Sequence, residues 1–107
     1  MSEQTWAQGR CAFITGATSG FGEALARRIV AGGGRVIATG RRAERLEALK
    51  SELGDGLLVR RMDIRSADSI AEALADLPAD FAAIDVLFNN AGLALGLAKA
   101  HEVDIGL

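Results

Sequence analysis

Apolar and polar positions change period repeatedly along this chain, and each change predicts a new element. The unbroken apolar run CAFI at residues 11–14 is typical of a strand buried on both faces of a parallel sheet. After a glycine turn the apolar positions recur at helical spacing, which predicts an amphipathic helix that ends at the glycines 32–34. That stripe consists of Phe21, Ala24, Leu25 and Ile29.

The same change of period recurs in the next segment. The run VIATG at residues 36–40 predicts a second strand, and Leu46, Leu49 and Leu53 mark one stripe of the helix that follows. Gly54 stands where a helix stop is expected. A second strand and a second helix are therefore predicted before residue 55.

Two further strands complete the pattern. Residues 57–63 predict the third strand, and Ser66 is a suitable N-cap for a helix that Pro78 closes. Residues 84–88 predict the fourth strand, which runs into NNAG. The stripe of the intervening helix consists of Ile70, Ala73, Leu74 and Leu77.

Alternating strands and helices, at about 25 residues per unit, favour right-handed crossovers and a parallel sheet. We therefore predict an α/β fold, a Rossmann-like parallel sheet with helices on both faces. The sheet is incomplete, with about four βα units and strand order 3-2-1-4. Residues 1–9 are interpreted as an N-terminal extension and residues 10–107 as part of one domain.

Composition narrows the classes of function. The 107 residues carry a formal net charge of −2, and no run of Lys and Arg exceeds two residues, which argues against a nucleic-acid-binding face. No apolar run is long enough for a membrane span, and the opening residues lack the apolar stretch of a secretory signal. With a single cysteine, Cys11, the expectation is a soluble cytoplasmic protein.

The stretch TGATSGFG, from Thr15 to Gly22, is the first candidate site. Gly16 would allow the turn off the strand, Gly20 would let a phosphate approach the backbone, and Gly22 would let the helix pack closely. The spacing G-x-x-x-G-x-G is neither the simplest Rossmann fingerprint nor a P-loop. A glycine turn that serves packing alone is the alternative interpretation.

TGRR, at residues 39–42, ends the second predicted strand. A dinucleotide-binding fold ordinarily has an acidic residue there for the ribose hydroxyls, but this chain has Gly40 followed by Arg41 and Arg42. Guanidinium groups match phosphate oxygens in charge and geometry, so this stretch predicts NADP rather than NAD. Alternatively, both arginines are simply the solvated start of the next helix.

Two other strand ends carry polar residues. The Asp63 carboxylate is placed to accept a hydrogen bond from an adenine amino group, or else to favour the start of the next helix through its dipole. In NNAG, residues 89–92, asparagine amides can tie neighbouring backbones together, and Ala-Gly leaves room above the strand. A plain turn would explain part of NNAG but not its position at the predicted crevice.

TGATSGFG and NNAG, in this order and about seventy residues apart, resemble the short-chain dehydrogenase/reductase family. VIATGRRAERLEALKSELGD and NNAGLALG are similar to its NADP-dependent 3-hydroxy acid dehydrogenase branch, which includes serine and allo-threonine dehydrogenases and malonic semialdehyde reductases. The resemblance covers roughly residues 10–101. It implies a cofactor-binding N-terminal half and a homo-oligomeric complete protein, a dimer or tetramer.

The resemblance also assigns residues to the cofactor NADP. It implies that Arg41 and Arg42 hold the 2′-phosphate and that Asp63 and Ile64 flank the adenine. The ribose and nicotinamide side would be lined by Asn90, Ala91 and Gly92. The phosphates would be surrounded by Gly16, Ala17, Thr18, Ser19, Gly20 and Phe21, with Gly22 next in the glycine motif.

The chain departs from the family in its chemistry. Members use a serine, a tyrosine and a lysine in a Y-x-x-x-K arrangement, but this sequence has no tyrosine, and Lys50 and Lys99 lie elsewhere. We expect an oxidoreductase as the parent protein, acting on NADP(H) and a small hydroxy or carbonyl substrate such as a 3-hydroxy acid. The 107-residue chain alone would be inactive and contain no catalytic residue.

Two alternatives stay open at this point. The first is a non-catalytic dinucleotide-binding module. The second is a flavodoxin-like domain that binds a different phosphate. His101 and Asp104 lack a third candidate ligand, so no metal site is expected. Cys11 is interpreted as a small buried apolar side chain.

Overall fold

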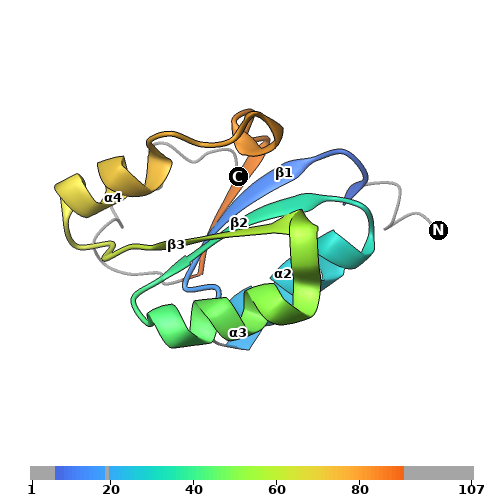
Figure 1. The fold of residues 1–107 in the computed structure, drawn as a ribbon, viewed down its shortest axis with the longest axis horizontal. Coiled ribbons are helices and arrows are strands. Elements are labelled where there is room, and N and C mark those ends of the chain that lie inside the picture. The colour runs from blue at the N-terminus through green and yellow to red at the C-terminus, as the bar shows by residue number, and fades with distance from the viewer. Residues whose placement is uncertain (1–6, 19, 91–107) are drawn as a thin grey trace.

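The computed structural model describes residues 7–18 and 20–90, which contain a parallel four-stranded sheet in the order β3-β2-β1-β4 (Figure 1). The pairings β1–β2, β1–β4 and β2–β3 are all parallel. The predicted α/β class and strand order are therefore confirmed. The strands are β1 (Cys11–Thr15), β2 (Arg35–Gly40), β3 (Leu57–Arg61) and β4 (Val86–Asn89).

Helices cover both faces of this sheet, as predicted (Figure 1). Two lie on one face, α2 (Gly20–Ala31) and α3 (Ala43–Leu53), and α4 (Ala67–Leu74) lies on the other. The chain steps from β1 to β2 to β3 in one direction and then returns past β1 to β4. Right-handed crossovers in opposite directions place their helices on opposite faces. Short 3₁₀ turns cover Gly54–Gly56 and Ala79–Phe81.

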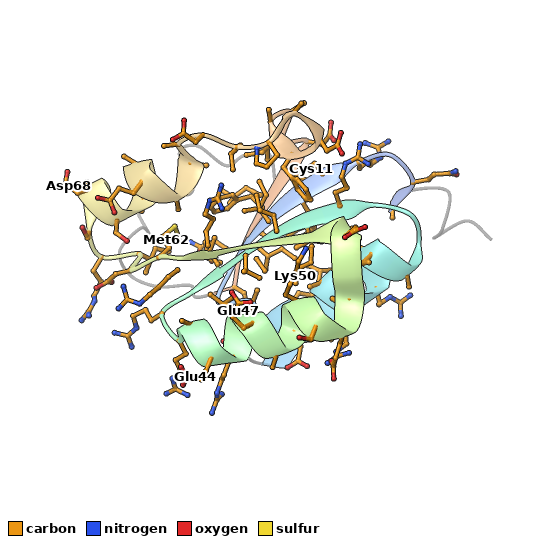
Figure 2. The ribbon with its side chains drawn as sticks, viewed as in Figure 1. Cys11, Glu44, Glu47, Lys50, Met62 and Asp68 are labelled. Atoms are coloured by element: carbon orange, nitrogen blue, oxygen red, sulfur yellow. The ribbon has the colours of Figure 1, made fainter. Side chains whose placement is uncertain are left out.

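Alternation along the strands divides the core into two layers. In β1, Ala12 and Ile14 face α2 and α3, whereas Cys11 and Phe13 face α4. Met62 belongs to the α4 layer, and Figure 2 shows it beside α4, just beyond β3. Strands with apolar side chains on both faces are what a sheet covered on both sides requires.

The buried face of α2 differs from the predicted stripe. Gly22, Ala26 and Ile29 are buried, whereas Phe21 is 66% exposed and Ala24 is exposed. The spacing of the buried residues is still helical, but the helix is rotated so that its glycine approaches the sheet. That rotation leaves Phe21 at the surface, next to the glycine turn.

The ends of α3 and α4 show what stops each helix. Gly54 adopts φ +74°, and its N–H donates to the Lys50 carbonyl, which confirms the predicted stop. The Ser66 side chain accepts from the Ser69 N–H at 3.1 Å, which confirms the predicted N-cap. Figure 2 labels Lys50, whose Nζ donates to the Gly54 and Leu57 carbonyls.

Three predicted element boundaries are wrong. Helix α4 ends at Leu74, not next to Pro78, because the residue before a proline is disfavoured in the helical region and the chain leaves the helix early, with Asp76 at φ +52°. Strand β3 ends at Arg61, not Asp63, because its partner β2 ends at Gly40. β4 begins at Val86, two residues later than predicted.

The predicted N-terminal extension contacts the domain at its described end. Ala7 is buried in the layer between the sheet and helices α2 and α3, and its carbonyl accepts from the Arg10 N–H at 2.9 Å. Gly9 donates to the Gly33 carbonyl at 3.2 Å. Within the described part of the chain, no helix combines the length and the apolar character needed to cross a membrane.

Candidate dinucleotide-binding site

The predicted site segments meet at the carboxyl edge of the sheet. Thr15, at the end of β1, pairs in register with Asn89 at the end of β4, and β2 ends alongside β1 at Gly40. In parallel sheets with helices on both faces, ligands bind beyond this edge. The structure thus brings together stretches that lie about seventy residues apart in the sequence.

The glycine turn is held by a residue from the far end of the described chain. Asn90 Nδ2 donates to the Gly16 carbonyl at 2.9 Å, and Gly16 has φ +62°, as a turn that needs glycine would. A Cβ at Gly22 would stand 2.5 Å from the Gly16 oxygen and 2.6 Å from Asn90 Nδ2. Gly22 therefore permits close packing against the turn and Asn90, which refines its predicted role.

Threonines at the strand ends also tie this edge together. Thr15 Oγ1 donates to Asn89 Oδ1 at 2.8 Å, and the buried Thr39 donates to the Ile14 carbonyl at 3.0 Å. The Ala17 N–H donates to the Thr39 carbonyl at 3.0 Å, and Ala17 is fully buried. The Ala17 amide therefore donates to the sheet and is not a phosphate donor. Ala17 contributes to the predicted phosphate loop by holding that loop in position.

The start of α2 is open to a ligand. Gly20 has φ +46°, and apart from its chain neighbours and the backbone of its own helix, no atom of the described residues lies within 4 Å of the position that a Cβ there would occupy. The first backbone N–H groups of a helix have no acceptor within it, and the helix dipole favours an anion beside them. Phe21, exposed in this first turn, lies beside these groups. The arrangement suits a phosphate group.

Arg41 and Arg42 begin the segment that follows β2. Both are exposed, and neither forms an ion pair with another residue in 7–18 or 20–90. Arg42 is the N-cap residue of α3, and its side chain makes no capping hydrogen bond. A Cβ at Gly40 would make only ordinary contacts, the nearest being 3.6 Å from Thr18 Oγ1. The fold therefore does not require a glycine there.

Asp63 is held by a neighbour that the sequence reasoning missed. Its Oδ1 accepts from Arg65 Nε at 3.1 Å and from the Arg65 N–H at 3.0 Å, while its own N–H donates to Ser69 Oγ at 2.8 Å. The Arg65 hydrogen bonds, with a smaller contribution from the Arg41 charge, lower the pKa of Asp63. Asp63 is thus an anion held in place just past the end of β3. The only sign of this pairing in the sequence is the opposite charge of Arg65, two residues later.

A mostly apolar cavity of about 320 Å³ opens on the α4 face of this edge. Ile64, one of the predicted adenine neighbours, lines it together with Asn89. It extends past β4 to Ile84, so it reaches beyond the predicted site. The other lining residues are Phe13, Thr15, Met62, Ile70, Leu74 and Leu87.

Some predicted site residues lie outside the described residues. They are Ser19, Ala91 and Gly92, together with the dismissed pair His101 and Asp104. Within residues 7–18 and 20–90, no three His, Cys, Asp or Glu side chains gather as a metal site would need. The polar side chains in the described part of the predicted site are those of Thr18, Arg41, Arg42, Asp63 and Asn90.

Comparison with known proteins matches this chain to one family. The family model for short chain dehydrogenases matches residues 10–105. The serine 3-dehydrogenase of Agrobacterium fabrum is 60% identical over 90 residues, which are 84% of this chain and 36% of that protein. The NADP-dependent 3-hydroxy acid dehydrogenase YdfG of Escherichia coli K12 is 54% identical over 92 residues, 86% of this chain and 37% of that protein.

Solved structures give the same result. The closed form of a serine dehydrogenase complexed with NADP⁺ superposes with a TM-score of 0.75 at 55% identity, covering 78% of this chain and 34% of that one. Serine dehydrogenase from Escherichia coli gives 0.74 at 53% identity, covering 88% and 44%. This chain therefore spans between a third and a half of the length of these relatives.

Proposed function

We propose that this chain, which belongs to the short-chain dehydrogenase family, is the part of an oxidoreductase that binds NADP(H). In this proposal residues 10–107 form the N-terminal part of a Rossmann-fold domain. The complete protein would transfer hydride between NADP(H) and a small hydroxy or carbonyl substrate. The similarity to a 3-hydroxy acid dehydrogenase and a serine 3-dehydrogenase favours a 3-hydroxy acid as substrate.

One observation carries the choice of NADP. Arg41 and Arg42 stand exposed just past β2, without ion pairs to other described residues, and Gly40 precedes them without a carboxylate. An acid at that strand end would bind ribose hydroxyls and repel a 2′-phosphate, whereas two guanidinium groups attract it. A relative whose structure was solved with NADP⁺ supports the same choice.

The rest of the described site suits the remaining parts of this cofactor. The pyrophosphate would lie at the start of α2, over Gly20 and Phe21, because the first N–H groups of a helix have no acceptor within it. Asp63 would accept a hydrogen bond from the adenine amino group beside Ile64. Asn90 would line the ribose and nicotinamide side, with Ala91 and Gly92 assigned there by the family resemblance alone.

Chemistry is assigned to the complete protein. A bound NADP(H) would supply the hydride acceptor or donor, and the residues described here would hold and orient it. The 107 residues include no tyrosine, the residue that the family uses to move a proton at the substrate oxygen. We also propose that the complete protein is a homo-oligomer that acts in the cytoplasm.

Titration with NADPH and NADH tests the cofactor assignment. The chain should bind NADPH more tightly than NADH. Arg41→Ala and Arg42→Ala should each lower the affinity for NADPH about tenfold and change the affinity for NADH less than about twofold. Arg28→Ala, an exposed arginine in the last turn of α2, is the matched control. Equal affinity for both cofactors, unaffected by the substitutions, would contradict the proposal.

Turnover tests the assignment of chemistry. The 107-residue chain, mixed with NADP⁺ and a 3-hydroxy acid, should form no NADPH above the protein-free rate, although it binds the cofactor. A protein that contains this chain followed by a Y-x-x-x-K segment should form NADPH under the same conditions. Binding without turnover in both proteins would favour a non-catalytic dinucleotide-binding module instead.

A further inference from the structure

The cleft between α2 and α3 brings Thr18, which the family resemblance places near the cofactor phosphates, together with Arg45, which the proposed cofactor site has not used. It has a volume of about 260 Å³ and begins at Thr18, in the glycine turn. Arg45, in the first turn of α3, lines the same cleft. The remaining lining residues are Glu23, Arg27, Ala48, Leu49 and Glu52.

The charges in this cleft are unevenly paired. Arg27 binds both carboxylates, with Nη2 at 2.8 Å from Glu23 Oε2 and in contact with Glu52 Oε1. The two glutamates and two arginines of the cleft balance in charge, and Arg27 binds both glutamates. Among the described residues no carboxylate holds the Arg45 guanidinium, which is therefore free to contact an anion.

The Thr18 hydroxyl is unengaged in a similar way. At the same edge, the hydroxyls of Thr15 and Thr39 both donate hydrogen bonds within the sheet. Thr18 is only half-buried, and its hydroxyl has no hydrogen-bond partner within residues 7–18 and 20–90. It lies beside Gly40, at 3.6 Å from the position of a Cβ there, where the proposed 2′-phosphate would be.

Arg45 approaches this place from α3. The Arg45 N–H donates to the Arg42 carbonyl at 3.1 Å, and residues three apart on a helix share one side. Arg41 lies close enough to Asp63 to lower the pKa of that carboxyl, so its charge acts toward β3. Arg41 and Arg42 directly follow Gly40, and Arg45 lines the cleft that also contains Thr18, so three arginines lie within five residues of this strand end.

We propose that Thr18 and Arg45 complete the 2′-phosphate site and contribute to the selection of NADP(H) over NAD(H). The Thr18 hydroxyl donates to a phosphate oxygen, and the Arg45 guanidinium supplies charge from the α2 side. This inference rests on the proposed NADP(H) site. It assigns Thr18, which the family resemblance placed among the residues around the cofactor phosphates, to the 2′-phosphate, and it adds Arg45 to the site. A phosphate dianion between Arg41, Arg42 and Arg45 would bind more tightly than between two arginines.

Arg45→Gln and Thr18→Val test this inference in the full 107-residue chain. Arg45→Gln should lower the affinity for NADPH about tenfold, and Thr18→Val should lower it about threefold. Either substitution should change the affinity for NADH less than about twofold. Arg45→Lys should restore part of the NADPH affinity, and Thr18→Ser most of it. Arg28→Gln is the matched control for loss of one exposed positive charge.

Ionic strength provides a second measurement. NADPH affinity should fall with added salt less steeply for Arg45→Gln than for the unsubstituted chain, because one cation no longer faces the phosphate. Far-UV circular dichroism and the unfolding midpoint of each variant report whether the fold is retained. A variant that loses its fold is replaced in the comparison by Arg45→Lys or Thr18→Ser.

The outcomes separate this inference from the proposed function. If Arg42→Ala weakens NADPH selectively but Arg45→Gln and Thr18→Val do not, the inference is wrong and the NADP(H) assignment stands. If Arg45→Gln weakens NADPH and NADH equally, Arg45 acts through the fold and the inference is also wrong. Equal affinity of the unsubstituted chain for both cofactors would overturn the inference and the cofactor assignment together.

Discussion

Asn90 Nδ2 donates a hydrogen bond of 2.9 Å to the carbonyl of Gly16, across 74 positions of sequence. The bond joins the residue after β4 to the turn after β1, so the two neighbouring strand ends are held in one arrangement. The same carbonyl and amide leave no room for a side chain at Gly22. The glycine turn is therefore shaped by tertiary contact as well as by its own backbone freedom.

Asn90→Ala should lower the free energy of unfolding by about 1 kcal/mol, because a partly buried carbonyl loses its donor. Urea unfolding followed by circular dichroism measures this change. Asn90→Asp, close in size, should lower it further at neutral pH, since a carboxylate cannot donate and would face the Gly16 oxygen. Unchanged stability in both variants would show that this hydrogen bond contributes nothing.

Gly22→Ala should destabilise the chain by about 1–3 kcal/mol, because its methyl group would stand 2.5 Å from a backbone oxygen. Alanine otherwise favours a helix over glycine, so a loss of stability would identify the steric contact as the cause. Gly40→Ala is the matched control, since its methyl group would meet only ordinary contacts. Thermal unfolding midpoints of the two variants give the comparison.

Gly40→Asp should shift cofactor preference toward NADH. The new carboxylate would lie at the end of β2, where it can accept from ribose hydroxyls and would repel a 2′-phosphate. We expect the affinity for NADPH to fall at least about tenfold and the affinity for NADH to stay the same or rise. Titration with each cofactor measures both affinities. Gly40→Asn, which lacks the charge, should reduce NADPH affinity much less.

Cys11 should be unreactive in the folded chain and should make stability depend on alkaline pH. Burial, followed by the negative charge of Asp85, raises the pKa of this thiol, while the Arg35 charge opposes the shift. Above the ordinary thiol pKa of about 8.5 the unfolded chain ionises and the folded chain keeps its proton, so the free energy of unfolding falls as pH rises.

Cys11→Ala isolates that effect. The decline in stability between neutral and alkaline pH, measured by urea unfolding, should be smaller in this variant than in the unsubstituted chain. A thiol reagent should label the unsubstituted chain rapidly in urea and slowly without it. Rapid labelling of the folded chain would contradict the buried position of Cys11.

The alternation of short apolar runs with helical stripes determined the fold class of this protein and limited the possible strand orders. A strand with apolar residues on both faces needs cover on both sides, and right-handed crossovers then leave few arrangements of four such units. The glycines at 16, 20 and 22 and the arginines 41 and 42 also marked the candidate site from the sequence, because their conformational freedom and charge are local properties.

Only the tertiary structure decided how these parts contact one another. Periodicity predicted an amphipathic helix after the glycine turn, but contact with Gly16 and Asn90 rotated α2 so that Gly22 is buried and Phe21 exposed. The commitment of the Ala17 amide to Thr39 and the pairing of Asp63 with Arg65 likewise depend on where the strand ends and turns lie. Sequence patterns encode which face of an element is apolar, whereas packing selects which groups remain free for a ligand.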